Sequence, residues 1–249
     1  MGYELWGKTT LNIILFQREE VELPLSLNDP RACHILDVLR LKPAGAFDAG
    51  LINGPRGVGT LVSINQDALT LSFSWGNLPP PLCPIHLLIG LPRPQTARDI
   101  LRDATTLGVA SLRFIRSERG ERSYFDSTLW KSDEWKKCVI NGASQAFCTR
   151  LPEVTCGGNL SEAIALLSPD INRVALDNYE GSMSLTEFNP STFTSTAIAL
   201  GSERGWSPNE RTALRTAGFT LAHLGPRVLR TETACVAAVT LVKAKLGLF

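Results

Sequence analysis

Two arginines and a glutamate lie close together near the end of the chain, where an apolar run gives way to a predicted helix. They belong to the segment Gly225-Pro-Arg-Val-Leu-Arg-Thr-Glu-Thr233. A turn that ends at a helix start leaves backbone N–H groups unpaired and directed at whatever lies in front of them. Together with the charged side chains, such a turn can bind a ligand. An ordinary strand–loop–helix joint with solvated charges has the same composition and is the alternative.

The helix after this segment is predicted from its ends. Thr231 or Thr233 can cap its start, the apolar residues continue to about Lys245, and Gly247 is a natural stop. Gly225 begins a sharp turn directly after the apolar run.

A second loop of the same kind is Gly201-Ser-Glu-Arg-Gly-Trp-Ser207. Like the first, it follows an apolar run, and it leads into a helix predicted by the capping box Ser207-Pro-Asn-Glu210. Glycines let its backbone approach a ligand closely. On physical grounds the two loops suit a phosphate or a nucleoside equally well. The absence of a Walker motif and of a dinucleotide fingerprint weakens the triphosphatase and dehydrogenase interpretations.

The elements that must position these loops are β-then-α units, which predict an α/β sheet whose ligands bind beyond the carboxyl ends of the strands. The strands are expected at 85–91, 109–115, 174–177, 196–200 and 219–224. Helices are expected after Thr96 and Ser132, as caps, and after Ser207. The run Pro79-Pro-Pro-Leu-Cys-Pro84 is a stiff linker and marks a domain boundary.

The residues before this linker predict a small β-rich unit with one helix. Asn28-Asp-Pro-Arg opens the helix, Asn53-Gly54 marks a turn between strands, and residues 69–75 alternate apolar and polar like a half-buried strand.

The run Leu224-Gly-Pro-Arg-Val-Leu-Arg-Thr-Glu-Thr-Ala234 resembles the C-terminal signature of the RsmE family, and eleven consecutive residues make this a specific match. These are methyltransferases of the SPOUT superfamily that use S-adenosylmethionine to methylate N3 of a uridine in small-subunit (16S) ribosomal RNA. The resemblance implies a PUA-like β-rich RNA-binding domain over residues 1–78, which includes His34-Ile-Leu-Asp-Val-Leu-Arg40. It also implies a SPOUT α/β methyltransferase domain with a trefoil knot over 79–249. His34 would face RNA in that case, although a structural histidine is the commoner use.

Carried over by position, the resemblance assigns the site residues. Arg230 and Glu232 fall beside the target base, where Arg230 would stabilise charge on the uracil and Glu232 would act as a base or only complement the helix dipole. The residues expected to bind the cofactor are Leu176, Leu200, Gly201, Ser202, Glu203, Gly205, Leu224, Gly225, Val228 and Leu229. The chain departs from the family pattern at Ser202, Arg204, Arg98, Asp103 and Cys148. Arg204 replaces a glycine, so a backbone that needs positive φ there would be strained.

RNA contact is expected from the β-rich domain and from arginines three residues apart around Gly120. The set is Arg113, Arg116, Arg119 and Arg122, with Arg227 as a further phosphate contact. Residues 93–137 carry ten basic and seven acidic side chains, a local net charge of +3 against +1 for the whole chain. A solvated mixed-charge surface is the alternative.

Composition and motifs bear on the cellular location and the partners of the protein. Six cysteines without a C-x-x-C pair indicate reduced thiols and a cytoplasmic protein, and no apolar run is long enough to span a bilayer. No metal is expected. The apolar C-terminal helix and the resemblance together imply a homodimer, with ribosomal RNA or the small ribosomal subunit as partner. The alternatives are a SPOUT methyltransferase with another RNA target and an inactive RNA-binding or ribosome-assembly protein of the same fold.

Overall fold

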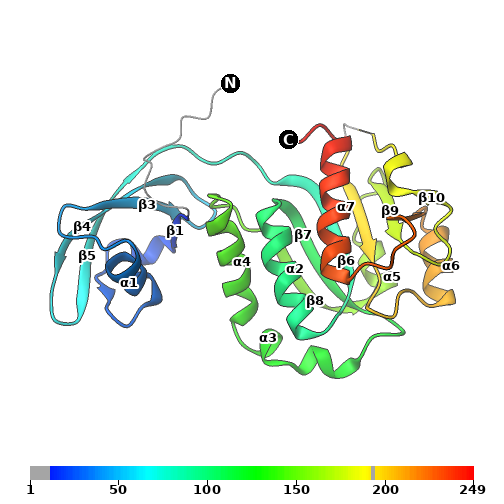
Figure 1. The fold of residues 1–249 in the computed structure, drawn as a ribbon, viewed down its shortest axis with the longest axis horizontal. Coiled ribbons are helices and arrows are strands. Elements are labelled where there is room, and N and C mark those ends of the chain that lie inside the picture. The colour runs from blue at the N-terminus through cyan, green and yellow to red at the C-terminus, as the bar shows by residue number, and fades with distance from the viewer. Residues whose placement is uncertain (1–11, 192–193) are drawn as a thin grey trace. The chain divides into compact units, whose positions relative to one another are not determined.

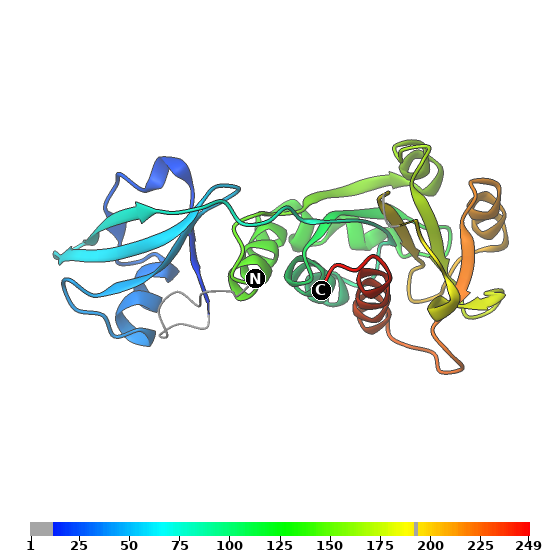
Figure 2. The same cartoon turned by 90° about the horizontal axis from the view of Figure 1, so that it is seen from above.

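The computed structural model describes residues 12–191 and 194–249 of the 249-residue chain. The chain divides into two compact units (Figures 1 and 2). Within the described residues, unit 1 comprises residues 12–81 and Ala143–Leu151, and unit 2 comprises Leu82–Gly142 and Pro152–Phe249.

Unit 1 is built on a five-stranded sheet in the order β1-β3-β4-β5-β2. Its strands are β1 (Ile14–Phe16), β2 (Leu25–Ser26), β3 (Ala46–Leu51), β4 (Arg56–Ile64) and β5 (Ala68–Trp75). The predicted alternation over 69–75 is confirmed as β5, and the predicted turn at Asn53-Gly54 joins β3 to β4, with Asn53 at a φ of 56°.

The one predicted helix of unit 1 begins as expected. Asp29 caps α1 (Pro30–Cys33), and its carboxylate accepts the backbone N–H of Arg31 at 2.8 Å. The helix continues as a π-helical segment, His34–Val38, and buries Ala32 and Ile35. The aromatic rings of the unit pack beside these residues, so the sheet and the helix enclose one core.

Ala143–Leu151 returns to unit 1 through main-chain and side-chain hydrogen bonds. The Thr149 hydroxyl donates to the carbonyl of Gly54, and the backbone N–H of Asn53 donates to the Thr149 carbonyl at 2.7 Å. The sequence does not predict this return, because Thr149 and its partner Gly54 are 95 residues apart in the chain.

Unit 2 contains a seven-stranded sheet in the order β10-β12-β9-β11-β6-β7-β8, all parallel. Its strands are β6 (Cys83–Gly90), β7 (Val109–Arg116), β8 (Glu153–Asn159), β9 (Asn172–Leu176), β10 (Met183–Ser184), β11 (Thr196–Leu200) and β12 (Thr220–His223). The predicted α/β class is confirmed, and the five predicted strands are present to within two residues at each end.

Helices cover both faces of this sheet (Figures 1 and 2). On one face lie α2 (Pro94–Thr106), α4 (Glu134–Gln145) and α7 (Thr231–Lys245), with the short α3 (Thr128–Lys131) next to α4. On the other face α5 (Leu160–Ala165) and α6 (Pro208–Thr216) pack on a core of small and branched residues from the central strands.

Short 3-10 segments lie between the longer elements. They are η1 (Arg18–Glu20), η3 (Arg122–Asp126) and η4 (Leu185–Glu187), while η2 is the π-helical segment His34–Val38.

Two predicted helix caps are wrong. α2 begins at Pro94 with Arg93 at its N-cap, three residues before the expected Thr96, because proline at the first helical position fixes the start. α7 has Arg230 at its N-cap and no side-chain cap, so neither Thr231 nor Thr233 serves there. Its end at Lys245 is as predicted, and Gly247 has the positive φ of a helix stop, 68°. The Ser207 capping box of α6 is confirmed.

Across the described residues, no helix is long and apolar enough to cross a membrane. All six cysteines are free thiols.

Candidate cofactor and RNA site

Three loops meet at one edge of the unit 2 sheet because the strands before them are neighbours and parallel. Leu200, the last residue of β11, lies in register with Leu176, the last residue of β9. Leu176 also lies in register with Ala222 of β12. The loops that follow β9, β11 and β12 therefore leave the sheet side by side, at the edge where open α/β sheets bind ligands. The sequence predicted the loops after β11 and β12 as ligand loops, and the family resemblance added the loop after β9.

The loop after β11 is a tight turn. The backbone N–H of Gly205 donates to the Ser202 carbonyl at 2.8 Å, and Gly205 takes a φ of 67°. A Cβ on Gly201 would lie 2.9 Å from the carbonyl carbon of Gly205, so the turn closes only with glycine there. Ser202 is 6% exposed, and its hydroxyl oxygen is buried with no hydrogen-bond partner among the described residues.

Trp206 fixes this loop to the end of β9. Its ring is fully buried, and its indole Nε1 donates to the carbonyl of Leu176 at 3.1 Å. The next residue, Ser207, caps α6 together with Glu210. The Glu210 carboxylate also accepts the backbone N–H of Glu118 at 2.9 Å, which joins the loop after β7 to the same structure.

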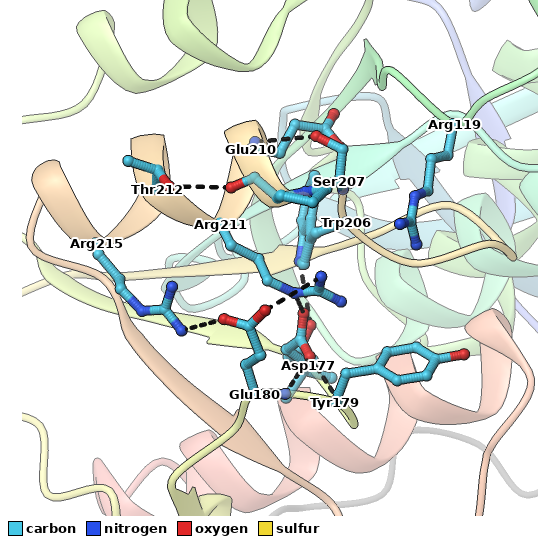
Figure 3. A network of polar contacts seen from close by, with 12 residues as sticks. Arg119, Asp177, Tyr179, Glu180, Trp206, Ser207, Glu210, Arg211, Thr212 and Arg215 are labelled. Atoms are coloured by element: carbon cyan, nitrogen blue, oxygen red, sulfur yellow. Dashed lines mark hydrogen bonds and ion pairs between the residues drawn. The ribbon is translucent and has the colours of Figure 1, made fainter.

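The loop after β9 is held by a buried carboxylate (Figure 3). Asp177 accepts the backbone N–H groups of Tyr179 at 2.7 Å and Glu180 at 2.8 Å. Its other oxygen accepts Nε of Arg211 from α6 at 2.6 Å. The Arg211 guanidinium also lies 5.4 Å from the centre of the Tyr179 ring. The loop is thereby fixed to α6, while the Tyr179 side chain stays on the surface.

The loop after β12 is more open. Gly225 has a φ of 98°, and its N–H donates to His223 Nδ1 at 3.1 Å. Val228 is 84% exposed, which is unusual for a branched apolar residue. The described residues offer no acceptor to the backbone N–H groups of Val228 and Leu229. An apolar surface beside unpaired N–H groups is what a nucleoside requires of a loop.

Arg230 and Glu232 form an ion pair at the start of α7, with Nε 2.7 Å from Oε1. The Arg230 side chain is 81% exposed and the Glu232 side chain only 18%. The largely buried Glu232 carboxylate therefore fixes one side of the Arg230 guanidinium, and the rest of the guanidinium extends into solvent.

These loops fit a methyl donor of the nucleoside class. The fit rests on three features. They are the unpartnered buried hydroxyl of Ser202, the glycines Gly201 and Gly205, which leave the backbone of that loop without side chains, and the exposed apolar surface at Val228. Leu176, Leu200 and Leu224 lie at the strand ends beneath the loops. No group of three or more His, Cys, Asp or Glu residues with metal-binding geometry occurs within the described ranges.

Glu203 is placed differently from the other predicted cofactor residues. Its carboxylate accepts the backbone N–H of Arg93 at 2.8 Å, at the start of α2. This side chain braces the first loop against α2.

The predicted arginine cluster is not one loop. Arg113 lies within β7 and not in the loop, and its Nε and Nη1 atoms are buried, which argues against a phosphate contact from this residue. Arg116 ends β7, Arg119 lies in the loop after it, and Arg122 begins the 3-10 segment η3; all three are exposed, as is Arg227. Arg119 Nη1 donates to the carbonyl of Arg204 at 3.2 Å, so the basic loop touches the loop after β11.

The departures are accommodated locally. Arg204 is exposed and keeps a negative φ, because the left-handed residue of the turn is Gly205; the expected strain at Arg204 is absent. Arg98 forms an ion pair with Glu134 at 2.6 Å, and Asp103 pairs with Arg102 at 3.0 Å. Cys148 lies in the segment that belongs to unit 1.

Sequence reasoning misses the residues that hold the loops together. Trp206 lies inside a predicted ligand loop, but nothing local indicates its bond with Leu176. Asp177 stands at the end of a predicted strand, and Arg211 at the first turn of a predicted helix. Their pairing over 34 residues leaves no pattern in the sequence.

Comparisons with known proteins agree with this geometry. A model of the RNA methyltransferase domain matches residues 79–243. The ribosomal RNA small subunit methyltransferase E of Treponema pallidum is 37% identical over 94% of this chain and 91% of its own length. The chain belongs to the RsmE family.

A further RsmE protein, from Borreliella burgdorferi, is 27% identical over 95% of this chain and 99% of its own length. Among solved structures, an RsmE of Neisseria gonorrhoeae bound to S-adenosylmethionine superposes with a TM-score of 0.73, at 23% identity, over 93% of this chain and 97% of that chain. The mixed α/β fold and the β-rich N-terminal unit are therefore those of RsmE proteins, as the C-terminal signature predicted.

Proposed function

We propose that this protein transfers the methyl group of S-adenosylmethionine to N3 of a uridine in small-subunit ribosomal RNA. Family membership supports the reaction class, and the convergence of three glycine-containing loops at the carboxyl edge of the unit 2 sheet supports the site. The observation that carries the proposal is the loop after β11, which is closed tightly on itself and still contains one buried hydroxyl without a partner.

The cofactor-binding residues proposed are those at the strand ends and in the two loops. S-adenosylmethionine supplies a methyl group on an electrophilic sulfonium, so the protein has to align the acceptor and manage its charge. The Ser202 hydroxyl and the free backbone N–H groups of the loop after β12 would hold the polar atoms of the nucleoside. Val228 and Leu229 would cover its apolar surface.

Arg230 is the proposed catalytic cation. Removing the proton from a uridine N3 leaves negative charge on the uracil, and a fixed guanidinium stabilises such charge best when it is already oriented. Glu232 provides that orientation through its 2.7 Å contact with Arg230 Nε. This contact favours a positioning role for Glu232, since its carboxylate is already engaged with Arg230.

The RNA partner would be met by unit 1 and by the exposed arginines. Unit 1 is proposed as the PUA-like RNA-binding domain, which was predicted as residues 1–78, and unit 2 as the catalytic domain, which was predicted as 79–249. The predicted division differs from these units in that Ala143–Leu151 belongs to unit 1. Arg116, Arg119, Arg122 and Arg227 are proposed phosphate contacts. Ribosomal RNA, free or in the small subunit, is the partner, and the cytoplasm is the corresponding location.

A homodimer and a knotted backbone complete the proposal. β12 enters the sheet between β9 and β10, both of which precede it, and this order is compatible with a trefoil knot. α7 packs on α2, yet Val236, Ala237 and Leu241 on its outer side stay partly exposed. Sedimentation of the full chain should show a dimer at micromolar concentration; a monomer would remove the idea of a shared site.

The decisive experiment is transfer of a labelled methyl group to small ribosomal subunits and to free 16S RNA, followed by mapping of the modified base. The proposal requires label at N3 of one uridine. Label elsewhere would identify a methyltransferase with another target. No transfer, with S-adenosylmethionine binding also absent by calorimetry, would identify an inactive RNA-binding protein.

A further inference from the structure

A second candidate binding site lies away from the cofactor loops, beside the edge strand β8. It is a cavity of about 330 Å³ lined by Phe125, Trp130, Lys131, Trp135, Val154 and Cys156. Ligand pockets in proteins range from roughly 300 to 1,000 Å³, so this one is large enough for a single small ring system. We refer to it as the aromatic pocket.

The walls of the aromatic pocket are rings held at different depths. Trp130 forms the inner wall, because its ring packs against buried Phe114 of β7 at a centroid distance of 4.9 Å. Trp135, on the first turn of α4, and Phe125, in the 3-10 segment η3, are both partly exposed. Three aromatic side chains from three separate elements thus surround a space that the protein does not fill.

Cations lie beside two of the rings of the aromatic pocket, and its two nearby lysines are paired with the exposed carboxylates of Asp126 and Asp133. The Arg116 guanidinium lies 5.1 Å from the centre of the Phe125 ring, and Lys136 Nζ lies 5.7 Å from that of Trp135. Lys131 lines the cavity, and its ion pair with Asp126 is well exposed on both sides, so a phosphate can replace the carboxylate at little cost. Burial raises the pKa of the Cys156 thiol to about 12, which keeps it neutral.

The aromatic pocket and the candidate active site are joined by one basic loop. Arg116 lies over the pocket residue Phe125, and three residues later Arg119 bonds to the carbonyl of Arg204 in the loop after β11. A strand of nucleic acid bound along this loop would have phosphates beside the arginines. One of its bases could then enter the cavity while another reaches the cofactor loops.

We infer that the aromatic pocket binds a nucleobase of the RNA substrate, one that is unstacked from its neighbours and lies outside the target uridine. Aromatic walls with flanking cations are the features that bind single-stranded nucleic acid, since every base has a π-face to stack and a phosphate next to it. An apolar peptide side chain would fill the same rings but would gain nothing from the lysines and Arg116. The inference rests on the proposed function for the identity of the ligand as RNA.

The test compares Trp135→Ala with Trp135→Phe in the full-length protein. Tryptophan fluorescence is titrated with a short uridine oligoribonucleotide and with an abasic oligoribonucleotide of the same length. Loss of one stacked base costs about 1–3 kcal/mol, so Trp135→Ala should raise the Kd for the uridine strand roughly 5- to 150-fold. The abasic strand, which has phosphates but no bases, should bind the wild type and Trp135→Ala equally. Trp135→Phe should recover most of the affinity.

Phe249→Ala is the matched control, because Phe249 is an 80% exposed ring that also lies next to a lysine but does not line the aromatic pocket. It should leave both Kd values unchanged. Equal losses for the two oligoribonucleotides in Trp135→Ala, or no loss for either, would overturn the inference. Lys131→Ala is an independent test at an exposed residue, and it should raise the Kd for both oligoribonucleotides.

The outcome is separable from that of the proposed function. If the wild type methylates ribosomal RNA and Trp135→Ala leaves the KM for RNA unchanged, only the pocket inference fails. If the wild type transfers no methyl group but Trp135→Ala still weakens binding of the uridine strand alone, only the proposed reaction fails.

Discussion

Arg211 Nε lies 2.6 Å from Asp177 Oδ2, and the two side chains are 6% and 1% exposed. This ion pair links α6 to the loop after β9. Because Asp177 also accepts two backbone N–H groups, one carboxylate sets the course of a loop that the sequence places at the ligand-binding edge (Figure 3). The loop after β9 is thus positioned by a buried ion pair outside the set of residues proposed to bind the cofactor.

Removing the arginine of this pair should strongly destabilise unit 2. Arg211→Met leaves the Asp177 carboxylate buried without its cation, and the expected loss is about 3–5 kcal/mol in the free energy of unfolding. Arg215→Met is the control, since Arg215 is 48% exposed and binds only the surface carboxylate of Glu180. Its loss should be at most about 1 kcal/mol. Urea unfolding monitored by intrinsic tryptophan fluorescence measures both, and equal losses would contradict the assignment.

Ser202→Ala should separate cofactor binding from stability. A buried hydroxyl without a partner is unfavourable in the free protein, so its removal should leave the unfolding free energy unchanged or slightly higher. If the hydroxyl bonds to S-adenosylmethionine, the affinity by calorimetry should fall by about 2- to 13-fold, corresponding to roughly 0.5–1.5 kcal/mol.

Ser207, five residues further along the chain, should affect stability instead of cofactor affinity. Ser207 accepts the backbone N–H of Glu210 as the cap of α6, and Ser207→Ala should cost about 1 kcal/mol of stability. Reduced stability of Ser202→Ala without any change in cofactor affinity would make Ser202 a structural residue.

How far the sequence predicted this structure depends on whether the signal was local. The capping box at Ser207, the turn at Asn53 and the helix start at Asn28-Asp-Pro-Arg each rest on neighbouring residues, and all three are confirmed. At α2 the local signals competed, and Pro94 prevailed over Thr96 because it also removes a donor that a helix start leaves unpaired.

The remaining site contacts could not be predicted, because their partners are distant in sequence. Trp206 meets Leu176 across 30 residues, and Arg119 meets Arg204 across 85. Arg113 and Arg116 look alike in the sequence. They differ in the structure because successive side chains of a strand face opposite sides, and only Arg116 lies at the strand end, where it is exposed.

Unit 1 should show an acid-dependent loss of stability that depends on Arg31. Hydrogen bonds from Arg31 lower the pKa of both Glu20 and Asp29, whose ordinary values are 4.5 and 3.8. A carboxyl whose pKa is lowered by folding contributes stability above its ordinary pKa and loses it as the pH falls through the folded value. Protection of unit 1 in hydrogen exchange should therefore decline below about pH 4.5 in the wild type.

The control for this pH dependence is Arg31→Met. Without the guanidinium, the main cause that lowers the pKa values of Glu20 and Asp29 is removed. The variant should therefore be less stable at neutral pH, and its stability should vary less with pH. The difference between the two proteins should shrink as the pH falls. A constant difference across that window would show that Arg31 acts by packing on Phe16, from whose ring centre it lies 4.9 Å.

Neutralising the exposed arginines of the loop after β7 should weaken RNA binding without affecting the cofactor. Removal of one arginine that binds a phosphate of single-stranded RNA should reduce the slope of log K against log salt by about 0.7. Arg122→Gln is the first variant, since Arg122 has no ion pair in the described part of the chain. Arg102→Gln, 50% exposed and paired with Asp99 and Asp103, is the control. An unchanged slope in Arg122→Gln would leave these arginines as a solvated surface.

Arg230→Ala should remove catalysis while leaving the protein folded and able to bind its cofactor. The side chain is 81% exposed and forms one ion pair, with Glu232, so its loss should cost little stability. One preorganised donor to developing charge is worth on the order of 3 kcal/mol, and turnover should fall about a hundredfold or more. Arg230→Lys should recover only part of the rate, because an ammonium does not reproduce the guanidinium fork. Single-turnover methyl transfer at saturating RNA and S-adenosylmethionine measures the effect directly.

Glu232→Gln distinguishes the two roles open to the carboxylate at this site. An amide can still accept a hydrogen bond from Arg230 Nε, so a positioning role predicts a modest loss of rate and an unchanged pH profile. A base role predicts a loss comparable to that of Arg230→Ala and the disappearance of the acidic limb of the profile. If Arg230→Ala keeps its turnover, or loses cofactor affinity in proportion to rate, Arg230 only shapes the loop and the proposed charge stabilisation is wrong.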